Sequence, residues 1–465
     1  MATVHNTSHS SAPTRRKVRA RDWPRRATPG SRSARRTRRR WQFIAGCFVV
    51  LCAAVVAGCG FQSGGDEIAF LRDGQLWTIG QDGLNPSAIA GRNVVGFAWS
   101  PSHHQIVVRT SAGAPPLAAG LAMAPDSAGN LSVTSADGGG TLTITPSVAG
   151  LARSDAWWNA GGNRLLYAED ILNSAGQVQG TPFYVLAQSD QPAGIARVVL
   201  QGGGDIPALA PDGAQVAAID ASGAVRLGKP GTSGRVLATG ALLSLPTNNR
   251  PARLLWQPGH DALLFATSGG SGQVNLVLAD LQGHTHTVGA VSELLDYAFA
   301  PDGSHVLIQT SSRFEVWSIG ATPSGLPTYT WDESDGDAQV WWSPDARYVL
   351  VSDGAGLWLA DLRRHALEHL LDQSSSAVAP PVDTHRFWHP LTGSPWSPDG
   401  AQIVFADSAY ASWLGHALPV PAAGGGLYVA SVVNARVAPT LIASGSIAWP
   451  SWSYLDPNAS WLVAA

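Results

Sequence analysis

Residues 396–400 read Trp-Ser-Pro-Asp-Gly, and the strand-like run Ile-Val-Phe follows at residues 403–405. Proline presets φ for the first corner of a turn, aspartate can accept hydrogen bonds from the following backbone, and glycine tolerates the left-handed conformation. β-Branched and aromatic residues favour strands. This stretch therefore predicts a β-hairpin in which Asp399 and Gly400 are turn residues.

The same pattern returns along most of the chain. Close copies lie at residues 209–213, 299–303 and 342–346, and weaker ones begin at Trp99, Trp158, Trp256 and Trp452. The eight leading residues are 43 to 59 positions apart. A repeat of this period is typical of a ring or an array built from one supersecondary unit.

Each copy also contains later strand-like segments. Residues 356–361 and 426–430 alternate as a third strand would, and a fourth strand is expected from Arg436 onward, where Pro439 suits a sheet edge. Four short strands per repeat predict the blade of a β-propeller. The count of leading residues favours eight blades, and the weak copies at Trp158 and Trp452 leave seven as the alternative.

The two ends of the repeat region predict a closed ring. Residues 68–71 and 76–79 read as a second and a third strand without a first, whereas residues 446–453 read as a first strand with little after it. Joined, they would form one composite blade, and closure removes exposed sheet edges. We expect an all-β fold, a single propeller of four-stranded blades over residues 66–465. Residues 111–150 are expected to form a long loop or an irregular blade with an insertion.

The amino-terminal region has a different character. Residues 1–41 hold 13 of the 30 Lys and Arg residues and one acidic residue, without apolar periodicity, and we expect a disordered basic tail on the cytoplasmic side. Residues 42–61 include an uncharged apolar run from Phe43 to Gly58. Such a run after a basic flank predicts an export signal or membrane anchor, with the propeller on the extracytoplasmic side of the cell membrane.

Residues 56–59 read Val-Ala-Gly-Cys, which resembles the bacterial lipobox, and this resemblance implies lipidation at Cys59. The basic region ahead of the apolar run is longer than lipoprotein signals usually have. The alternative is an uncleaved anchor, because the 19 residues from Phe43 to Phe61 are just long enough to span a bilayer. Both interpretations tether the propeller to the membrane.

Charge and cysteine content narrow the classes of partner and cofactor. Beyond the basic tail the chain keeps 17 of its 30 basic and 32 of its 33 acidic residues, a net charge of about −15. Such a field repels phosphate groups, so we expect no nucleic-acid partner. The three cysteines are Cys47, Cys52 and Cys59, so no thiolate is available after residue 59. We expect no cofactor.

The repeat resembles the WD40-like (PD40) repeat of the TolB family of periplasmic β-propellers. The resemblance rests on the Trp-Ser-Pro-Asp-Gly turn, the Ile-Val-Phe run and the later Leu-Tyr-Val-Ala at residues 427–430, and it covers roughly residues 66–465. With the amino-terminal segment, the chain is similar to exported bacterial lipoproteins. The resemblance implies the fold and says little about function, because propellers serve in binding, scaffolding and catalysis.

Two clusters are candidates for a metal site. On a helix, His365 and His369 would share one face, but a polar turn is favoured because the segment is short and follows a strand. Asp332, Asp335 and Asp337 surround a glycine as calcium ligands do, yet the closing glutamate of an EF-hand loop is missing and a solvated loop is favoured.

The remaining candidates favour no reaction. His284, His286, His385 and His389 are interpreted as exposed or hydrogen-bonded, and residues 268–272 as a hairpin loop rather than a nucleophile elbow. We therefore expect a non-enzymatic module that binds a protein or an envelope polymer. The alternative is a ligand sensor, or an enzyme of hydrolase or lyase type, with polar residues gathered at the mouth of the ring. A plain structural spacer is the third possibility.

Overall fold

The computed structural model describes residues 67–453. The gaps within this range are residues 92, 111–125, 128–129, 147, 149–150, 155, 173–177, 193–203, 248–251, 321–325, 333–338, 354–355, 373–393, 407, 414–415, 422–424 and 434–437. The predicted tail at 1–41, the apolar segment at 42–61 and Cys59 lie outside the described residues. The chain divides into two units, Met1–Gln62 and Ser63–Ala465, and the fold below belongs to the second.

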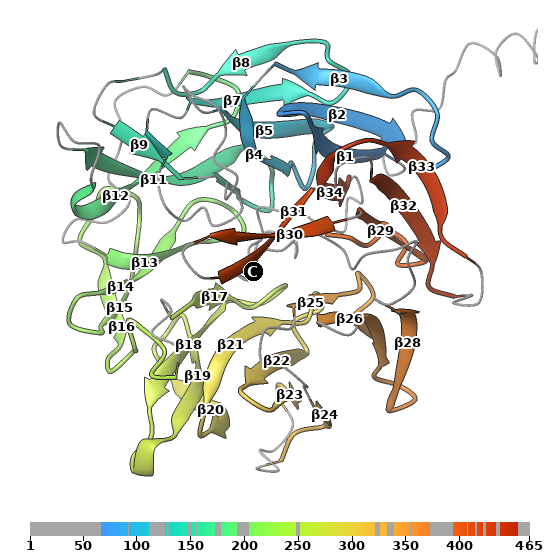
Figure 1. The fold of residues 1–465 in the computed structure, drawn as a ribbon. Helices are drawn as coiled ribbons and strands as arrows, with labels where there is room; N and C mark the ends of the chain where they lie inside the picture. Colours follow the sequence, from blue (N-terminus) through green and yellow to red (C-terminus); the bar gives the residue numbers. More distant parts are fainter. Residues whose placement is uncertain are drawn as a thin grey trace, which may run out of the picture. The chain divides into compact units, whose positions relative to one another are not determined.

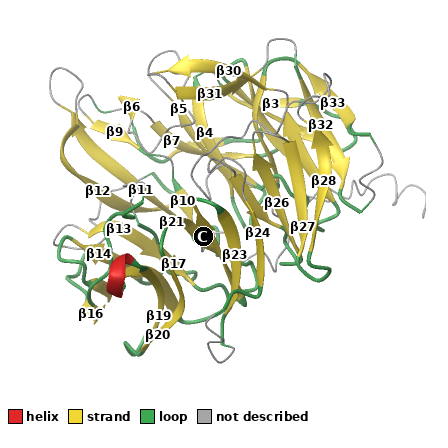
Figure 2. Cartoon of the chain, turned by 60° about the horizontal axis from the view of Figure 1, so that its bottom comes forward, coloured by secondary structure: helices red, strands yellow, loops and turns green. Residues whose placement is uncertain are grey.

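The second unit is an all-β propeller of eight blades, and Figure 1 shows its sheets arranged in a ring. In the described residues the one short helix is η2 (Gly270–Gly272), seen in Figure 2. From the ring centre outward, blade 1 consists of β34 (Ile447–Trp452), β1 (Glu67–Arg72), β2 (Gln75–Gly80) and β3 (Ser87–Ala90), and blade 2 of β4 (Val94–Trp99), β5 (Gln105–Thr110), β7 (Asn130–Ser135) and β8 (Thr141–Thr143). Blade 3 consists of β9 (Leu151–Arg153) with β10 (Trp157–Trp158), β11 (Arg164–Leu172) and β12 (Val178–Gln188). Blade 4 consists of β13 (Gly204–Leu209), β14 (Val216–Asp220), β15 (Val225–Gly228) and β16 (Arg235–Ala238).

Blades 5 to 8 follow the same order. Their strands are β17 (Leu254–Trp256), β18 (Ala262–Ser268), β19 (Val274–Asp280) and β20 (Thr285–Val291); β21 (Leu294–Phe299), β22 (His305–Thr310), β23 (Arg313–Ser318) and β24 (Tyr329–Asp332); β25 (Gln339–Trp342), β26 (Tyr348–Asp353), β27 (Gly356–Asp361) and β28 (Ala366–Asp372); and β29 (Gln402–Ala406), β32 (Gly426–Ser431) and β33 (Thr440–Ser444). The prediction of eight blades, rather than seven, is confirmed.

The ring is closed as the sequence predicts. β34, from the end of the described chain, pairs antiparallel with β1, from its beginning, and the closing blade has the order β3-β2-β1-β34. The pairing shifts register between Ala69 and Leu71, where Trp449 adopts a φ of 53°. A bulge of this kind bends a strand and increases its local twist.

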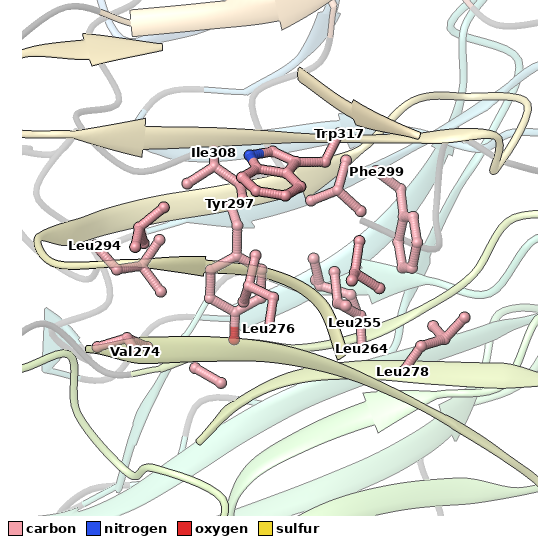
Figure 3. Packing of buried hydrophobic residues seen from close by; sticks show 14 of the residues in the cluster. Leu255, Leu264, Val274, Leu276, Leu278, Leu294, Tyr297, Phe299, Ile308 and Trp317 are labelled. Atoms are coloured by element: carbon pink, nitrogen blue, oxygen red, sulfur yellow. The ribbon is translucent and has the colours of Figure 1, made fainter. Parts of the chain in front are cut away.

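The hydrophobic core lies between blades. The described residues form eight buried clusters, and each is shared by two neighbouring blades, including the pair of blades 8 and 1. Figure 3 shows one of them, in which Leu264 and Leu276 of blade 5 pack against Tyr297 and Trp317 of blade 6. Because a blade buries both of its faces, its inner strands are buried almost without alternation, as β22 is.

The tryptophans that lead the repeats also join blades by hydrogen bonds. In four blades the indole N–H donates to the backbone carbonyl just before the leading residue of the preceding blade. These bonds run from Trp99 to Ser451, Trp158 to Ala98, Trp256 to Ala208 and Trp396 to Trp341, at 3.1 to 3.2 Å. The tryptophan content therefore reflects both packing and a repeated polar contact between blades.

The turn between first and second strands has the predicted chemistry. Asp399 accepts a hydrogen bond from the backbone N–H of Ala401 at 3.0 Å, and Asp302 does the same for Ser304. Gly303 and Gly400 have a φ of 69°, in the left-handed region. In the copy that lacks this glycine, Ala346 takes the same region with a φ of 55°.

Blade 8 departs from the prediction at its first strand. Residues 396–405 are the clearest copy in the sequence, yet Trp396 joins Ile403 by one isolated bridge and no longer first strand is formed among the described residues. Pro395 lies just before Trp396 and has no N–H to donate to a ladder. The carbonyl of Pro395 still accepts a hydrogen bond from Val404 at 2.7 Å.

Antiparallel pairing gives the ring two distinct faces. We call turn face the side that holds the links from first to second and from third to fourth strands, such as residues 343–347 and 362–365 of blade 7. We call insertion face the opposite side, which holds the links from second to third strands and from one blade to the next. The insertion face carries both of the extra elements described below.

Candidate functional site

Blade 8 carries an additional hairpin on the insertion face. β30 (Ser408–Trp413) and β31 (His416–Pro421) pair with each other between the second and third strands of this blade. Figure 1 shows the hairpin across the middle of the ring, and Figure 2 shows it on one side of the blades. β31 also lies against β34, the innermost strand of the closing blade.

Blade 2 carries the second additional element in the corresponding link. β6 (Asp126–Ser127) lies between β5 and β7 in the sequence but pairs with β9 of blade 3, on the edge of β9 that faces away from β11. That edge is the inner edge of blade 3. β6 therefore belongs to blade 2 in the sequence but lies on the side of blade 3 that faces the ring centre. Residues 111–150, expected to form a long loop or an irregular blade with an insertion, thus hold the extra element β6 but also β7 and β8, the regular third and fourth strands of blade 2.

Buried charged side chains near this face join blades 2 and 3. Arg109, which is 2% exposed, donates to the carbonyl of Arg153 at 3.4 Å. Arg153 in turn donates to Glu169 at 2.7 Å and to the carbonyl of Pro146 at 2.8 Å. Burial raises the pKa of Tyr167, and the carboxylate of Glu169 adds to that shift. This arrangement stabilises the blade contact through satisfied buried charges.

A second charged contact joins blades 5 and 6. Arg253 lies 3.5 Å from the carboxylate of Asp296, at the start of β21. The hydroxyl of Tyr297 accepts a hydrogen bond from the backbone N–H of Arg253 at 3.0 Å and donates to its carbonyl. Burial raises the pKa of Tyr297, so this phenol stays protonated. These groups are engaged in packing the blades against each other.

The predicted acidic cluster is only partly described. Asp332 is the last residue of β24 and therefore lies at the insertion face. Asp335 and Asp337 lie outside the described residues, as do His385 and His389. The link that holds the two aspartates and the link that holds the two histidines each connect an outermost strand to the next blade. Their described flanking residues are therefore at the insertion face as well.

His365 and His369 lie elsewhere. His365 occupies the turn between β27 and β28 on the turn face, with a φ of 52°, and its ring centroid is 5.2 Å from that of Tyr329. His369 lies within β28, and its ring is tilted against that of Trp358 with the centroids 4.4 Å apart. Both histidines are exposed at the outer edge of blade 7, and β28 is a strand rather than the helix that would align the two imidazoles. The structure does not bring them together with Asp332.

The other candidates have ordinary surroundings. His284 is exposed and its Nδ1 lies 2.8 Å from Asp280, whereas His286 is part of β20. Residues 268–272 belong to the hairpin between β18 and β19, where Gly269 donates to the carbonyl of Gln273 at 2.7 Å. Within the described ranges, no three His, Cys, Asp or Glu side chains are placed to hold a metal ion.

The hairpin β30–β31 was not predicted from the sequence. The available signal was spacing, because Trp396 and Trp452 are 56 positions apart while two other neighbouring pairs of leading residues are 43 apart. Extra length within a repeat maps to a link between strands. The pairing of β6 with another blade left no such signal.

Comparisons with known proteins identify no family and give distant structural likenesses only. No protein-family model and no curated protein matches the chain. Similar solved structures include an oligogalacturonate lyase in complex with manganese, with 16% identity over 77% of this chain and 82% of that one, at a TM-score of 0.42. A eukaryotic initiation factor shows 10% identity over 83% and 98% of the two chains, with a TM-score of 0.49.

A putative 6-phosphogluconolactonase from Bacteroides fragilis shows 10% identity over 66% of this chain and 95% of that one, with a TM-score of 0.35. At such identities these likenesses carry no statement about function. The resemblance to the TolB-type repeat stays a prediction. In the part of the chain that the structure describes, no helix has the length and apolar character needed to cross a bilayer.

Proposed function

We propose that the chain is a membrane-tethered, extracytoplasmic β-propeller that binds a protein or a cell-envelope polymer through its insertion face. The observation that carries this proposal is the hairpin β30–β31, an addition to the repeat that reaches over the middle of the ring. Links that extend from a rigid scaffold are where proteins commonly place binding residues. The second addition, β6, emerges at the same face.

Two further observations support a binding role without catalysis. The buried charged groups near this face, Arg109, Arg153 and Asp296 among them, are engaged in contacts between blades. The net charge of about −15 after the basic tail disfavours a nucleic-acid ligand. The tether rests on the apolar segment at residues 42–61 and on Cys59.

The test removes the hairpin and leaves the ring. Residues 408–421 are replaced by a short Gly-Ser link, and crosslinked partners recovered from native membranes are compared with those of the intact chain. The matched control changes the exposed hairpin turn of blade 5 on the turn face, as Gln282→Ser. We expect the crosslinked partner to be lost only without the hairpin, with the melting temperature of the ring preserved. Retention of the same partner without the hairpin would contradict binding through the insertion face.

Membrane attachment is tested separately. Cys59→Ala should abolish incorporation of labelled fatty acid and leave the amino-terminal segment attached if lipidation provides the tether, and should not change the processing of the chain if the apolar run itself is the anchor. Fatty-acid labelling and mass spectrometry distinguish the two, and flotation of membranes on a density gradient measures attachment. A wild-type chain that does not float with membranes would contradict the tether itself.

A further inference from the structure

The described chain enters the ring at its turn face. β1 starts at Glu67, which pairs with Gly80, the residue that leads into the link between β2 and β3. The carbonyl of Glu67 accepts a hydrogen bond from Ser453 at 2.8 Å. Its carboxylate lies 2.5 Å from His104, in the first turn of blade 2. Three contacts thus place the entry of the chain on the turn face.

Chain length limits how the ring can be held. Residues 60–66 separate Cys59 from Glu67, and a fully extended chain of this length reaches about 28 Å. To reach the insertion face around the rim, the segment would have to cross β2 and β3, about 10 Å, and then run the length of a blade, about 20 Å. That path is longer than the extended segment, and side chains lengthen it further. The other path, through the middle of the ring, would thread the segment through the fold, which proteins avoid.

Exposed aliphatic side chains are concentrated at the turn face. The described residues contain eight large hydrophobic side chains that are exposed. Two of them are at the insertion face, Val148 in the link between blades 2 and 3 and Ile171 near the end of β11. The other six lie in, or within two residues of, the turns between third and fourth strands; they are Leu84, Val236, Leu326, Leu367, Val433 and Leu441, exposed by 40% to 80%.

These six side chains are spread over five blades rather than gathered in one patch. Leu84 and Leu441 come from the neighbouring blades 1 and 8, since the turn at Gly83 lies against Ile442 of β33. Leu326, at 71% exposed, and Val433, at 80%, extend the series. Aliphatic groups around one face suit a planar apolar boundary, which the interface of a lipid bilayer provides.

We propose that the turn face is the membrane-facing side of the propeller, with these aliphatic side chains at the bilayer interface and the insertion face turned away. The inference rests on the tether proposed above. It adds the surface that meets the lipid and leaves the hairpin β30–β31 accessible to a partner. Because the propeller region is acidic, the contact depends on apolar burial and on the tether rather than on anionic headgroups.

The test uses the absence of cysteine after residue 59. In the full chain with Cys47 and Cys52 changed to serine, one cysteine is added in place of Leu84 or Gln282 on the turn face, or of Ala221 or Ser312 on the insertion face, all exposed positions, and the chain without an added cysteine measures any label on Cys59. Each carries a fluorophore, and the chain is reconstituted in phosphatidylcholine vesicles that contain a nitroxide-labelled headgroup lipid. We expect quenching at the turn face to be several-fold stronger.

Equal quenching at both faces, or stronger quenching at the insertion face, would overturn this orientation while the tether stands. Failure of the chain to float with the vesicles would overturn the tether instead.

A second comparison isolates the aliphatic side chains. Leu326→Ser with Leu367→Ser should reduce quenching of the reporter at position 282 at least two-fold, and Ile171→Ser, the matched change on the other face, should leave it unaltered. Unchanged quenching in the double variant would contradict the contact.

Discussion

At the scale of single residues, the repeat is preserved through turn chemistry more than through side-chain identity. Ala346 shows this because it adopts the left-handed conformation that glycine takes in the neighbouring copies. That region costs an L-residue roughly 1–2 kcal/mol, whereas glycine enters it freely. The position is therefore strained, and the strain is local to one turn.

We predict that Ala346→Gly raises the free energy of unfolding by less than about 1 kcal/mol, since relief of strain is partly offset by the greater freedom of glycine in the unfolded chain. Gly400→Ala should lower it by about 1 kcal/mol, because φ is 69° and the nearest atom to the new methyl, Pro344 Cδ, is 3.7 Å away. Gly303→Ala should cost more, since its methyl would collide with the carbonyl of Pro258. Denaturant titration measures all three, and an equal loss at Gly303 and Gly400 would contradict the steric argument.

The indole hydrogen bond gives a second residue-level prediction. Trp256→Phe keeps an aromatic ring but removes the donor to Ala208, which should cost about 1–3 kcal/mol through the unsatisfied buried carbonyl. Trp342→Phe is the matched control, because its indole N–H has no hydrogen-bond partner in the described structure. Both changes lose a similar volume, so the difference between their free energies of unfolding measures the hydrogen bond. No difference would mean that the contact contributes nothing net.

At the scale of elements, the attachment of β1 to blade 2 depends on pH. The hydrogen bond with Glu67 raises the pKa of His104 above 6.5, and burial opposes the shift. A raised pKa in the folded state adds stability below pH 6.5, and this contribution is lost as pH rises through the folded pKa. Both side chains are partly exposed, so the effect is modest.

We expect Glu67→Gln to lower the melting temperature most at pH values below 6.5, with the difference from wild type shrinking as pH rises above neutrality. Asp82→Asn, in an exposed turn of the same blade, is the control and should show no such trend. Thermal melts between pH 5 and 8 supply the comparison. A difference that grows with pH would have the wrong sign for this pair.

The same scale shows what could be predicted from sequence. The closing strand at 446–453 follows from local alternation and appears in the structure, whereas at residues 396–405 the turn and the second strand form but the first strand is reduced to one bridge between Trp396 and Ile403. The hairpin β30–β31 is local, but its contact with β34 and the pairing of β6 with β9 join distant segments, which no local pattern records. Which of the candidate residues share a face could not be predicted for a similar reason. The face on which a link lies depends on which strand of the blade it follows. His365 follows a third strand and lies on the turn face, whereas Asp332 ends a fourth strand and lies on the insertion face.

At the scale of the whole molecule, closure should control cooperativity. A chain that ends at Gly445 lacks β34, so β1 has no inner neighbour. The cluster between blades 8 and 1 also loses Trp452. We expect it to be aggregated or to lose its cooperative thermal transition. Deletion of residues 454–465 keeps β34 and should change the melting temperature far less. Size-exclusion chromatography and calorimetry test this, and a monomeric, cooperative chain without β34 would argue against closure as the main restraint.

The position of β34 also sets a timetable for synthesis. The first blade receives its innermost strand from residues 447–452, which are made after all the other described strands. Until they emerge, the three strands β1 to β3 have an unpaired inner edge, and each new blade has only its predecessor to pack against. The nascent chain must therefore be shielded from other unpaired strands, and synthesis that stops shortly before residue 447 would release a polypeptide with an aggregation-prone edge.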